Sequence, residues 1–314
     1  MKTAALSSSR PLVTRLLRRA KYYVLINAFI CGVASASHQF VSHFQAQSSA
    51  SKSSALLAVY GATLMRITAM VLWFDWIASM KTKILGAKRV QLTSAQRQAI
   101  YLRILWLVVP TECVSYWLAA PSTAIESSAQ GVNLGSFMNE FAAFIPKSLA
   151  FEVALFWIAT PAEGLPPSHV TGLGSFLAEF AVFVPKSLAF ELVFDLFHYG
   201  AHWLCHQSTW LYQHAHKRHH MHLHPCPLST YEQDAIDLCL TNVLPFLLAM
   251  RFGFSLTALQ LHLVLAYKTY VEVAGHSGLE IKGFSFPQLP WLNDVVAICL
   301  RVHDHDLHHT HPNE

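Results

Sequence analysis

The chain has 314 residues, of which 53% are hydrophobic and only 13% are charged, and its mean hydropathy is +0.35. This composition argues against an ordinary soluble domain and indicates a membrane protein, while the modest net charge of +4 gives no indication of nucleic-acid binding. The six cysteines have no regular spacing, so they predict no disulfide scaffold.

The N-terminus is basic and contains no acidic residue before Asp75. A basic segment before the first apolar run predicts a positive anchor on the cytosolic side of a membrane. An organelle transit peptide is the alternative, because such peptides are also rich in Arg and Ser and poor in acids. The basic residues are Arg10, Arg15, Arg18, Arg19 and Lys21.

Apolar stretches long enough to suggest membrane helices recur along the chain. A helix needs about 20 apolar residues to cross the hydrocarbon, so we expect an all-α, polytopic membrane helix bundle with about four to six spans. The last stretch has room for two spans, with a break near Arg251–Ser255. Charged residues within the spans are expected to face the bundle interior or a cavity; they are Arg66, Asp75, Arg103 and Glu112. The stretches lie near 22–37, 55–79, 99–120, 136–160, 174–198 and 235–275.

A direct repeat occurs in the middle of the chain. The segment 134–155 is a near-duplicate of 173–194, with 15 of 22 positions identical. Copies this similar indicate a recent local duplication or a gene-model error, and a transporter-type repeat is the less favoured alternative. Only the second copy continues into histidines. We divide the chain into an N-terminal membrane region, 1–130, and a catalytic domain, 131–314.

The second copy leads into a polar stripe that organises the rest of the chain. At about 100° per residue, the side chains at 191, 195, 198, 202 and 206 fall within a sector of roughly 80° on one helix. The stripe must face something polar, because unpaired polar groups are costly to bury. His202 and His206, at i and i+4, have the spacing of ligands to one metal. The adjacent Cys205 is expected to be a packed thiol. The other members of the stripe are Glu191, Asp195 and His198.

Two further histidine clusters repeat this spacing. Sixteen of the nineteen histidines lie at or beyond His198. His216, His219 and His220 stand at i, i+3 and i+4, and His305, His308 and His309 do so again. Single pairs of this kind are often ordinary surface histidines, but three such groups predict metal binding. We expect His262 to be a satisfied histidine of the bundle, and we expect outer contacts or solvent for His214, His222, His224, His303 and His311.

The histidines are predicted to lie at one membrane face. A continuous helix from Phe176 to His206 would be about 46 Å long, whereas the hydrocarbon is about 30 Å thick, although Pro185 is expected to kink it. Lys217 and Arg218 favour the cytosolic side. We therefore expect a cytosolic, histidine-rich metal cap on the bundle. The histidine clusters at 202–220 and 305–309 can share metals only if both lie on this face. The segment 235–275 between them must therefore cross the membrane twice or not at all.

In these residues the chain resembles the fatty acid hydroxylase/sterol desaturase superfamily of integral-membrane di-iron oxygenases. The matching pattern covers roughly residues 174–311. Its first box is Asp195, Tyr199 and His202-Trp-Leu-Cys-His206, and its second is His216-Lys-Arg-His219-His220. His276-Ser-Gly and His305-Asp-Leu-His308-His309 complete it.

The chain departs from the family pattern at two places. Trp203 stands where the family usually has Arg, which removes a cation near the site. The family also continues beyond its last box, so the sequence is expected to be truncated after Glu314.

The resemblance implies two non-haem iron ions, with O2 as co-substrate. Neutral imidazoles bind mid-to-late transition metals, and two ions with four to five nitrogens each need about eight to ten ligands. His198 is a further possible ligand. Asp195 and Glu191 are expected to orient the ligand rings. The ligands are predicted to be His202, His206, His216, His219, His220, His276, His305, His308 and His309.

The resemblance also implies the reaction and the partners. The expected activity is hydroxylation or desaturation of a sterol or a long-chain fatty acyl or sphingolipid substrate in lipid biosynthesis. Electrons would come from a b-type cytochrome and an NAD(P)H reductase, and the expected membrane is the endoplasmic reticulum. The alternatives are a membrane metal-binding or metal-transport protein and a catalytically inactive relative.

Overall fold

The computed structural model is all-helical in the parts of the chain that it describes, with no strand among those residues. They are residues 12–47, 52–80, 92–119, 172–252, 256–279, 286–289, 292 and 301–311. The predicted all-α class is confirmed. The first copy of the repeat, 134–155, and the apolar stretch 136–160 lie outside the described residues.

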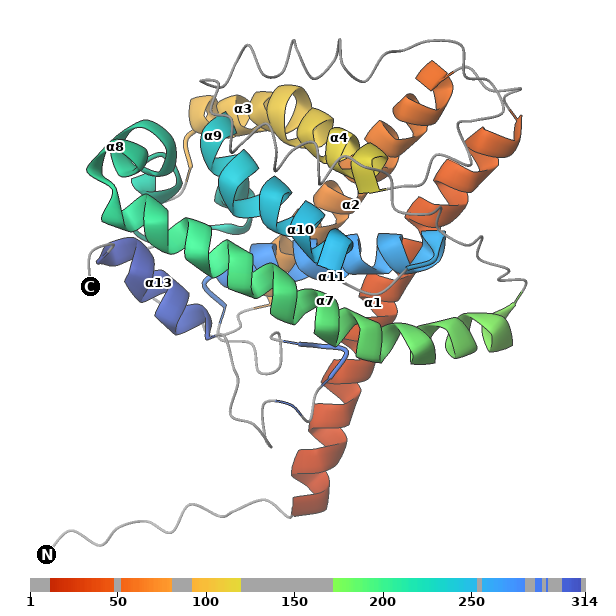
Figure 1. Ribbon diagram of the computed structural model, residues 1–314. Helices are drawn as coiled ribbons and strands as arrows, with labels where there is room; N and C mark the ends of the chain where they lie inside the picture. The colour runs from red at the N-terminus through yellow and green to blue at the C-terminus, as the bar shows by residue number, and fades with distance from the viewer. Residues whose placement is uncertain are drawn as a thin grey trace, which may run out of the picture.

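Three helical runs near the N-terminus are long and apolar enough to cross a membrane. Their candidate spans are Ala20–Gln45, Ser54–Ser79 and Ser94–Ala119. α1 packs against α2, and α2 packs against α4 (Figure 1). Three of the expected spans therefore have matching helices, while the total of four to six stays a prediction. The helices are α1 (Leu12–Gln47), α2 (Lys52–Ser79), α3 (Ser94–Arg103), a π-helical segment (Ile104–Val108) and α4 (Val109–Ala119).

Two of the four charged residues in these runs lie inside the bundle, as predicted. The buried Arg66 of α2 forms an ion pair with Glu112 of α4. Its Nε also donates to the hydroxyl of Thr269, 3.2 Å away. These contacts compensate the charge that the bundle buries. The prediction is wrong for Asp75, which is exposed. It also does not hold for the half-buried Arg103, which donates to the backbone oxygen of Gln233 at 2.7 Å.

The second copy of the repeat begins the long helix α7 (Leu173–Gln207), which continues through Pro185. Short helical segments follow it and turn the chain back (Figure 1). They are α8 (Thr209–Leu211), a π-helical segment (Tyr212–His216) and the 3-10 segments His219–Met221 and Pro227–Tyr231. The second histidine cluster therefore lies on a compact turn rather than on a long helix.

The apolar stretch 235–275 forms a helical hairpin. Its first arm is α9 (Ala235–Asp237), a π-helical segment (Leu238–Val243) and α10 (Leu244–Phe252), and its second arm is α11 (Ala258–His276). Contacts from Asp237 to His216 and from His276 to His219 bring both outer ends of the hairpin to the end of α7. The predicted break near 251–255 is confirmed by the end of α10 and the start of α11.

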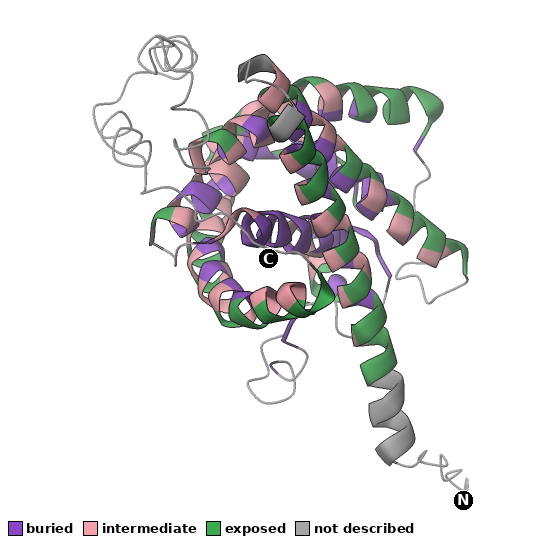
Figure 2. Ribbon diagram, turned by 90° about the vertical axis from the view of Figure 1, so that its right-hand side faces the viewer, coloured by how far each residue is buried: buried purple, intermediate pink, exposed green. Residues whose placement is uncertain are grey.

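The second arm of the hairpin, α11, forms the core of the fold. Its sequence is apolar on all sides, which is typical of a helix surrounded by other helices. It packs against α1, α2, α7 and α13 (Val302–Thr310), and nearly all of its residues are buried. Figure 2 shows this buried helix in the middle, with exposed residues on the helices around it. The histidine at its end is therefore held by the most buried helix of the described bundle.

Candidate metal centre

Nine histidines from four parts of the chain converge at the end of the bundle. Two come from α7, three from the turn at 216–220, one from the end of α11 and three from α13. They form two groups, and within each group one ring nitrogen of every histidine lies within 4.8 Å of those of the others. The first group is His202, His206, His216, His220 and His308, and the second group is His219, His276, His305 and His309.

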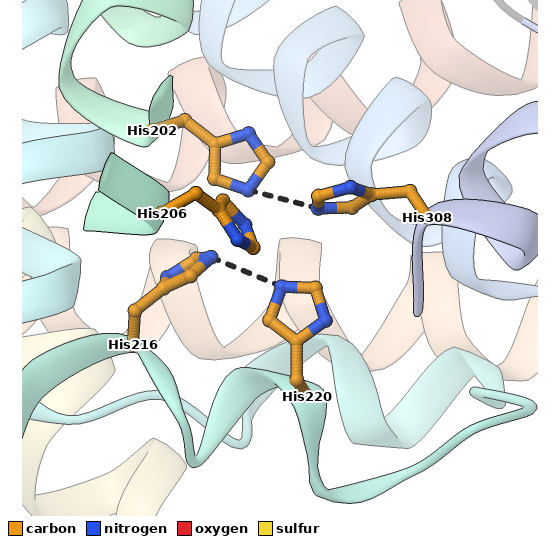
Figure 3. Close-up of side chains that lie close together, drawn as sticks. All are labelled: His202, His206, His216, His220 and His308. Carbon is orange, nitrogen blue, oxygen red and sulfur yellow. Dashed lines mark hydrogen bonds between the residues drawn. The ribbon is translucent and has the colours of Figure 1, made fainter. Parts of the chain in front are cut away.

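The first group has five imidazoles. Figure 3 shows their rings directed towards a common space from α7, the 216–220 turn and α13. The Nε2 atoms of His202 and His308 are 3.2 Å apart, and those of His216 and His220 are 3.1 Å apart. His206 lies between these pairs, with its ring centroid 4.9 Å or less from the other four.

The second group has four imidazoles and lies against the core helix. The Nε2 of His276 is 3.4 Å from that of His219 and 3.2 Å from that of His305. Nδ1 of His276 lies 2.8 Å from the backbone oxygen of Glu272, which leaves Nε2 directed at the group. His309 completes it, with its ring centroid 4.8 Å from those of both His219 and His305.

These distances fit metal coordination. Two nitrogens about 2.1 Å from one ion, at angles of roughly 90–109°, lie about 3.0–3.4 Å apart. The four Nε2 pairs measure 3.1–3.4 Å. Both ring nitrogens of the buried His309 have no hydrogen-bond partner among the described residues. Leaving such atoms unsatisfied is costly, and an ion in the second group would satisfy one of them.

Imidazoles of both groups are in the protonation state that binds metals, as four of them illustrate. Burial, reinforced by neighbouring imidazoles, lowers the pKa of His220 to about 2 and that of His308 to about 4. The same causes hold the pKa values of His219 and His305 well below their ordinary value. These rings are therefore neutral near pH 7, and a neutral imidazole offers a free nitrogen lone pair to a metal.

A buried carboxylate behind the first group was not singled out in the sequence. Asp237 is 0% exposed, and its Oδ1 lies 2.8 Å from Nδ1 of His216. A proton on Nδ1 would leave Nε2 free towards the group, as in carboxylate–histidine–metal arrangements. Its local signal is a run of three acidic residues after the second cluster, Glu232, Asp234 and Asp237. Cys205 is fully buried beside this pair, and burial raises the pKa of its thiol to about 11.

The two acids of the α7 stripe do not take the expected role of orienting the rings. Within the described part of the chain, Glu191 accepts a hydrogen bond from the Gln288 amide rather than from an imidazole. Asp195 lies one helical turn before His198 and has no hydrogen bond to any of the nine rings in that part. Both acids line a cavity instead. The reason is their position on α7: they precede the ligand histidines by about two to four turns.

His198 lies beside the first group but outside it. Its ring stacks on that of His202 with centroids 5.7 Å apart. Its Nδ1 lies 2.6 Å from the backbone oxygen of Thr241. This contact ties α7 to the first arm of the hairpin, so the geometry favours a supporting role over a ligand role.

Other histidines contact acidic residues and thereby connect the segments that surround the two groups. His222 contacts Glu232 at 3.1 Å, and His224 contacts Asp306 of α13 at 3.1 Å. These pairs are the outer contacts expected for such residues. His214 and His303 are exposed, as expected. His262, in the bundle, has its Nε2 3.4 Å from the Tyr116 hydroxyl, whereas its buried Nδ1 has no hydrogen-bond partner among the described residues, so the expected satisfied histidine is satisfied at one nitrogen only.

A cavity of about 560 Å³ extends from both groups into the bundle. Histidines of both groups, His202 and His276 among them, line one end. Away from them the wall is mainly aromatic and aliphatic, and it includes Phe183, Phe190 and Phe246. An apolar cavity of this size beside a few polar groups is typical of a site for a small ligand.

Comparison with known proteins is consistent with this geometry. A family model described as fatty acid hydroxylase matches residues 187–314, which include all nine histidines. "Fatty acid hydroxylase vlmA" of Lecanicillium sp is 30% identical over 122 residues. That alignment covers 38% of this chain and 33% of the relative, so it spans about a third of the relative's length. No solved structure matches the chain.

Proposed function

We propose that this chain is a membrane-bound, non-haem di-iron oxygenase that hydroxylates or desaturates a lipid. The premise is that the chain belongs to the fatty acid hydroxylase/sterol desaturase superfamily, because the family model matches residues 187–314. The observation that carries the proposal is the convergence of nine imidazoles in two groups at one end of a mainly apolar cavity. The membrane part of the proposal rests on the three helices that are apolar and long enough to span.

The chain's own residues have three tasks in this function. The first group and the second group would each hold one iron ion through the ring nitrogens that face one another. Bound iron would supply the activation of O2 and the removal of hydrogen from an unactivated lipid C–H bond. The aromatic wall of the cavity would bind the apolar part of the lipid and exclude water from the reacting carbon.

The remaining components are part of the same proposal. Electrons would reach the site from a b-type cytochrome and an NAD(P)H reductase. The membrane would be the endoplasmic reticulum. The histidines would lie on its cytosolic face, because Lys217 and Arg218 lie in the turn that carries the second box. The substrate would be a sterol or a long-chain acyl or sphingolipid, as part of lipid biosynthesis.

The orientation can be tested on its own. Gln207, exposed at the end of α7, is replaced by cysteine in a background without the native cysteines. In sealed microsomes, a membrane-impermeant maleimide should label it from the outside, which is the cytosolic face. Labelling only after the vesicles are opened would refute the cytosolic site.

The function itself is tested with the purified full-length protein. We expect about two irons per chain, and O2-dependent formation of an alcohol or alkene when lipid, cytochrome and reductase are supplied. If the protein instead holds one tightly bound zinc and forms no product with any electron donor, the result would favour a metal-binding protein. Two irons without any product from a broad lipid panel would favour an inactive relative.

A further inference from the structure

Lys268 and Glu272 add two charged groups to the wall of the cavity, on the most buried helix of the described bundle. Between Leu259 and His276, every residue of α11 is buried except Lys268, Val271 and Glu272. All three line the cavity. Their exposed surface therefore borders the space that we assign to the lipid.

Lys268 and Glu272 form an ion pair that has no net charge and contains both a hydrogen-bond donor and an acceptor. The ammonium group donates to the side-chain oxygen of Asn242 and to Oε1 of Glu272, both at 2.6 Å. An ammonium has three N–H bonds, and the third has no hydrogen-bond acceptor within the described part of the chain. The ring of Phe194 lies nearby, with its centroid 5.3 Å from Nζ. The other oxygen of Glu272 likewise has no hydrogen bond there. A donor and an acceptor thus stand side by side.

This pair matches one kind of ligand group. A hydroxyl or an amide can accept from Lys268 and donate to Glu272 at once. An ether or an ester can only accept, and a carboxylate would meet the charge of Glu272. Two more carboxyl groups line the cavity without an ion pair among the described residues, at Glu191 and Asp195, and a third, Glu112, is paired with Arg66. Lys268 is the one lysine or arginine among the described lining residues. The cavity therefore disfavours a free fatty acid anion.

The position of the pair fixes its distance from the metal centre. Glu272 and Lys268 precede His276 by four and eight residues on α11, which is about 6 and 12 Å along a helix axis. An aromatic wall continues past the pair, away from the histidines, with Phe190 and Phe246. A ligand group held there would set how far along the lipid the reacting carbon lies.

We infer that the cavity binds a lipid carrying a neutral group that both donates and accepts a hydrogen bond, a hydroxyl or an amide, and that Lys268 and Glu272 hold this group one to two helical turns from the histidines. The inference rests on the proposed function and narrows its substrate class. Lys268 and Glu272 are thus specificity-determining residues, because they contact the lipid at a distance from the reacting carbon.

The test is a binding experiment that needs neither O2 nor electrons. The full-length protein in detergent binds tritiated hexadecan-1-ol, and unlabelled hexadecanamide, 1-methoxyhexadecane and hexadecanoate compete. The alcohol or the amide should bind about tenfold or more tightly than the ether and the carboxylate, since only they use both charged partners. Tighter binding of the alcohol would indicate a hydroxyl lipid, and tighter binding of the amide would indicate an amide lipid. Equal affinity for alcohol, amide and ether in the unmodified protein would overturn the inference.

Two variants complete the test. Lys268→Met/Glu272→Gln removes both charges together, so it leaves no unpaired ion, and the preference should fall below about threefold. Lys186→Met is the control: Lys186 also donates to an amide, that of Gln260, but does not line the cavity. It should keep the preference. A preference that survives in the double variant would refute the role of the pair.

Failure of this inference can be told apart from failure of the proposed function. A protein that prefers the alcohol or the amide but forms no oxygenated product with any donor would refute the function alone. A protein with two irons and O2-dependent product, but with no preference among the probes, would refute the inference alone.

Discussion

The first and second histidine groups differ in what holds them. The first group has five imidazoles, two of them on α7, and a buried carboxylate, Asp237, behind one of its rings. The second group has four imidazoles, one at the end of the core helix α11, and no such carboxylate among the described residues. The first group therefore has a spare ligand and an orienting partner, whereas the second depends on its burial and on the packing of α11 against the surrounding helices.

The two groups are nevertheless coupled. The 216–220 turn and α13 each contribute to both of them. Neighbouring residues such as His308 and His309 belong to different groups. A change in either shared element should therefore affect both metals, while a change confined to α7 or α11 should affect mainly one.

The largest effect is expected when both groups lose a ligand from their shared helix. His308→Ala/His309→Ala removes one imidazole from each group, so the second group should lose its iron and the first should hold its iron only weakly, which leaves at most one weakly bound iron per chain. Iron is measured by plasma emission on the purified protein. His303→Ala, an exposed histidine on the same helix, is the control and should retain both irons. More than one iron in the double variant would contradict the assignment of these residues.

The single variants should distinguish the groups. His309→Ala leaves three imidazoles in the second group and should empty it, giving about one iron per chain. His308→Ala leaves four in the first group, so its iron should be weakened but retained at low chelator concentration. Chelator titration of the two variants measures the difference. If His308→Ala loses its iron as readily as His309→Ala, the spare-ligand explanation is wrong.

A smaller effect is expected from the carboxylate behind the first group. Asp237→Asn keeps the shape but removes the charge, and should weaken the iron of the first group by about 10- to 100-fold. Competition with a chelator should show one weakened and one unchanged iron. Asp234→Asn is the control, because Asp234 pairs with Arg218 rather than with an imidazole. Equal weakening of both irons would mean that Asp237 stabilises the fold rather than His216.

The smallest effect is expected from the repeat. Deleting 134–172 removes the first copy and leaves α7 whole, so membrane insertion and both irons should be unchanged if that copy is a recent duplication or a gene-model error. Iron content and alkaline extraction of membranes measure the two outcomes. A well-expressed deletion variant that has lost its iron would show that the first copy is required.

The sequence was sufficient to predict the helical class, the hairpin in 235–275 and the identity of the nine converging histidines. For eight of these histidines the physical reason is local periodicity, because residues three or four apart lie on one face of a helical turn. His276 was predicted from the family resemblance alone. His202 with His206, and His305 with His309, follow this rule, and each pair belongs to one group. The order and spacing of the histidine clusters along an apolar chain also supported the family resemblance.

Only the tertiary structure decided how the histidines are divided between the two groups. Side chains of adjacent residues in a helical turn diverge by about 100°, so His219 and His220 cannot face the same ion, although one motif contains both. Their partners come from α7, α11 and α13, which folding alone brings together. The same holds for Asp237 behind His216 and for Lys268 in the cavity wall. Their roles depend on contacts between helices, and these contacts leave no periodic trace in the sequence.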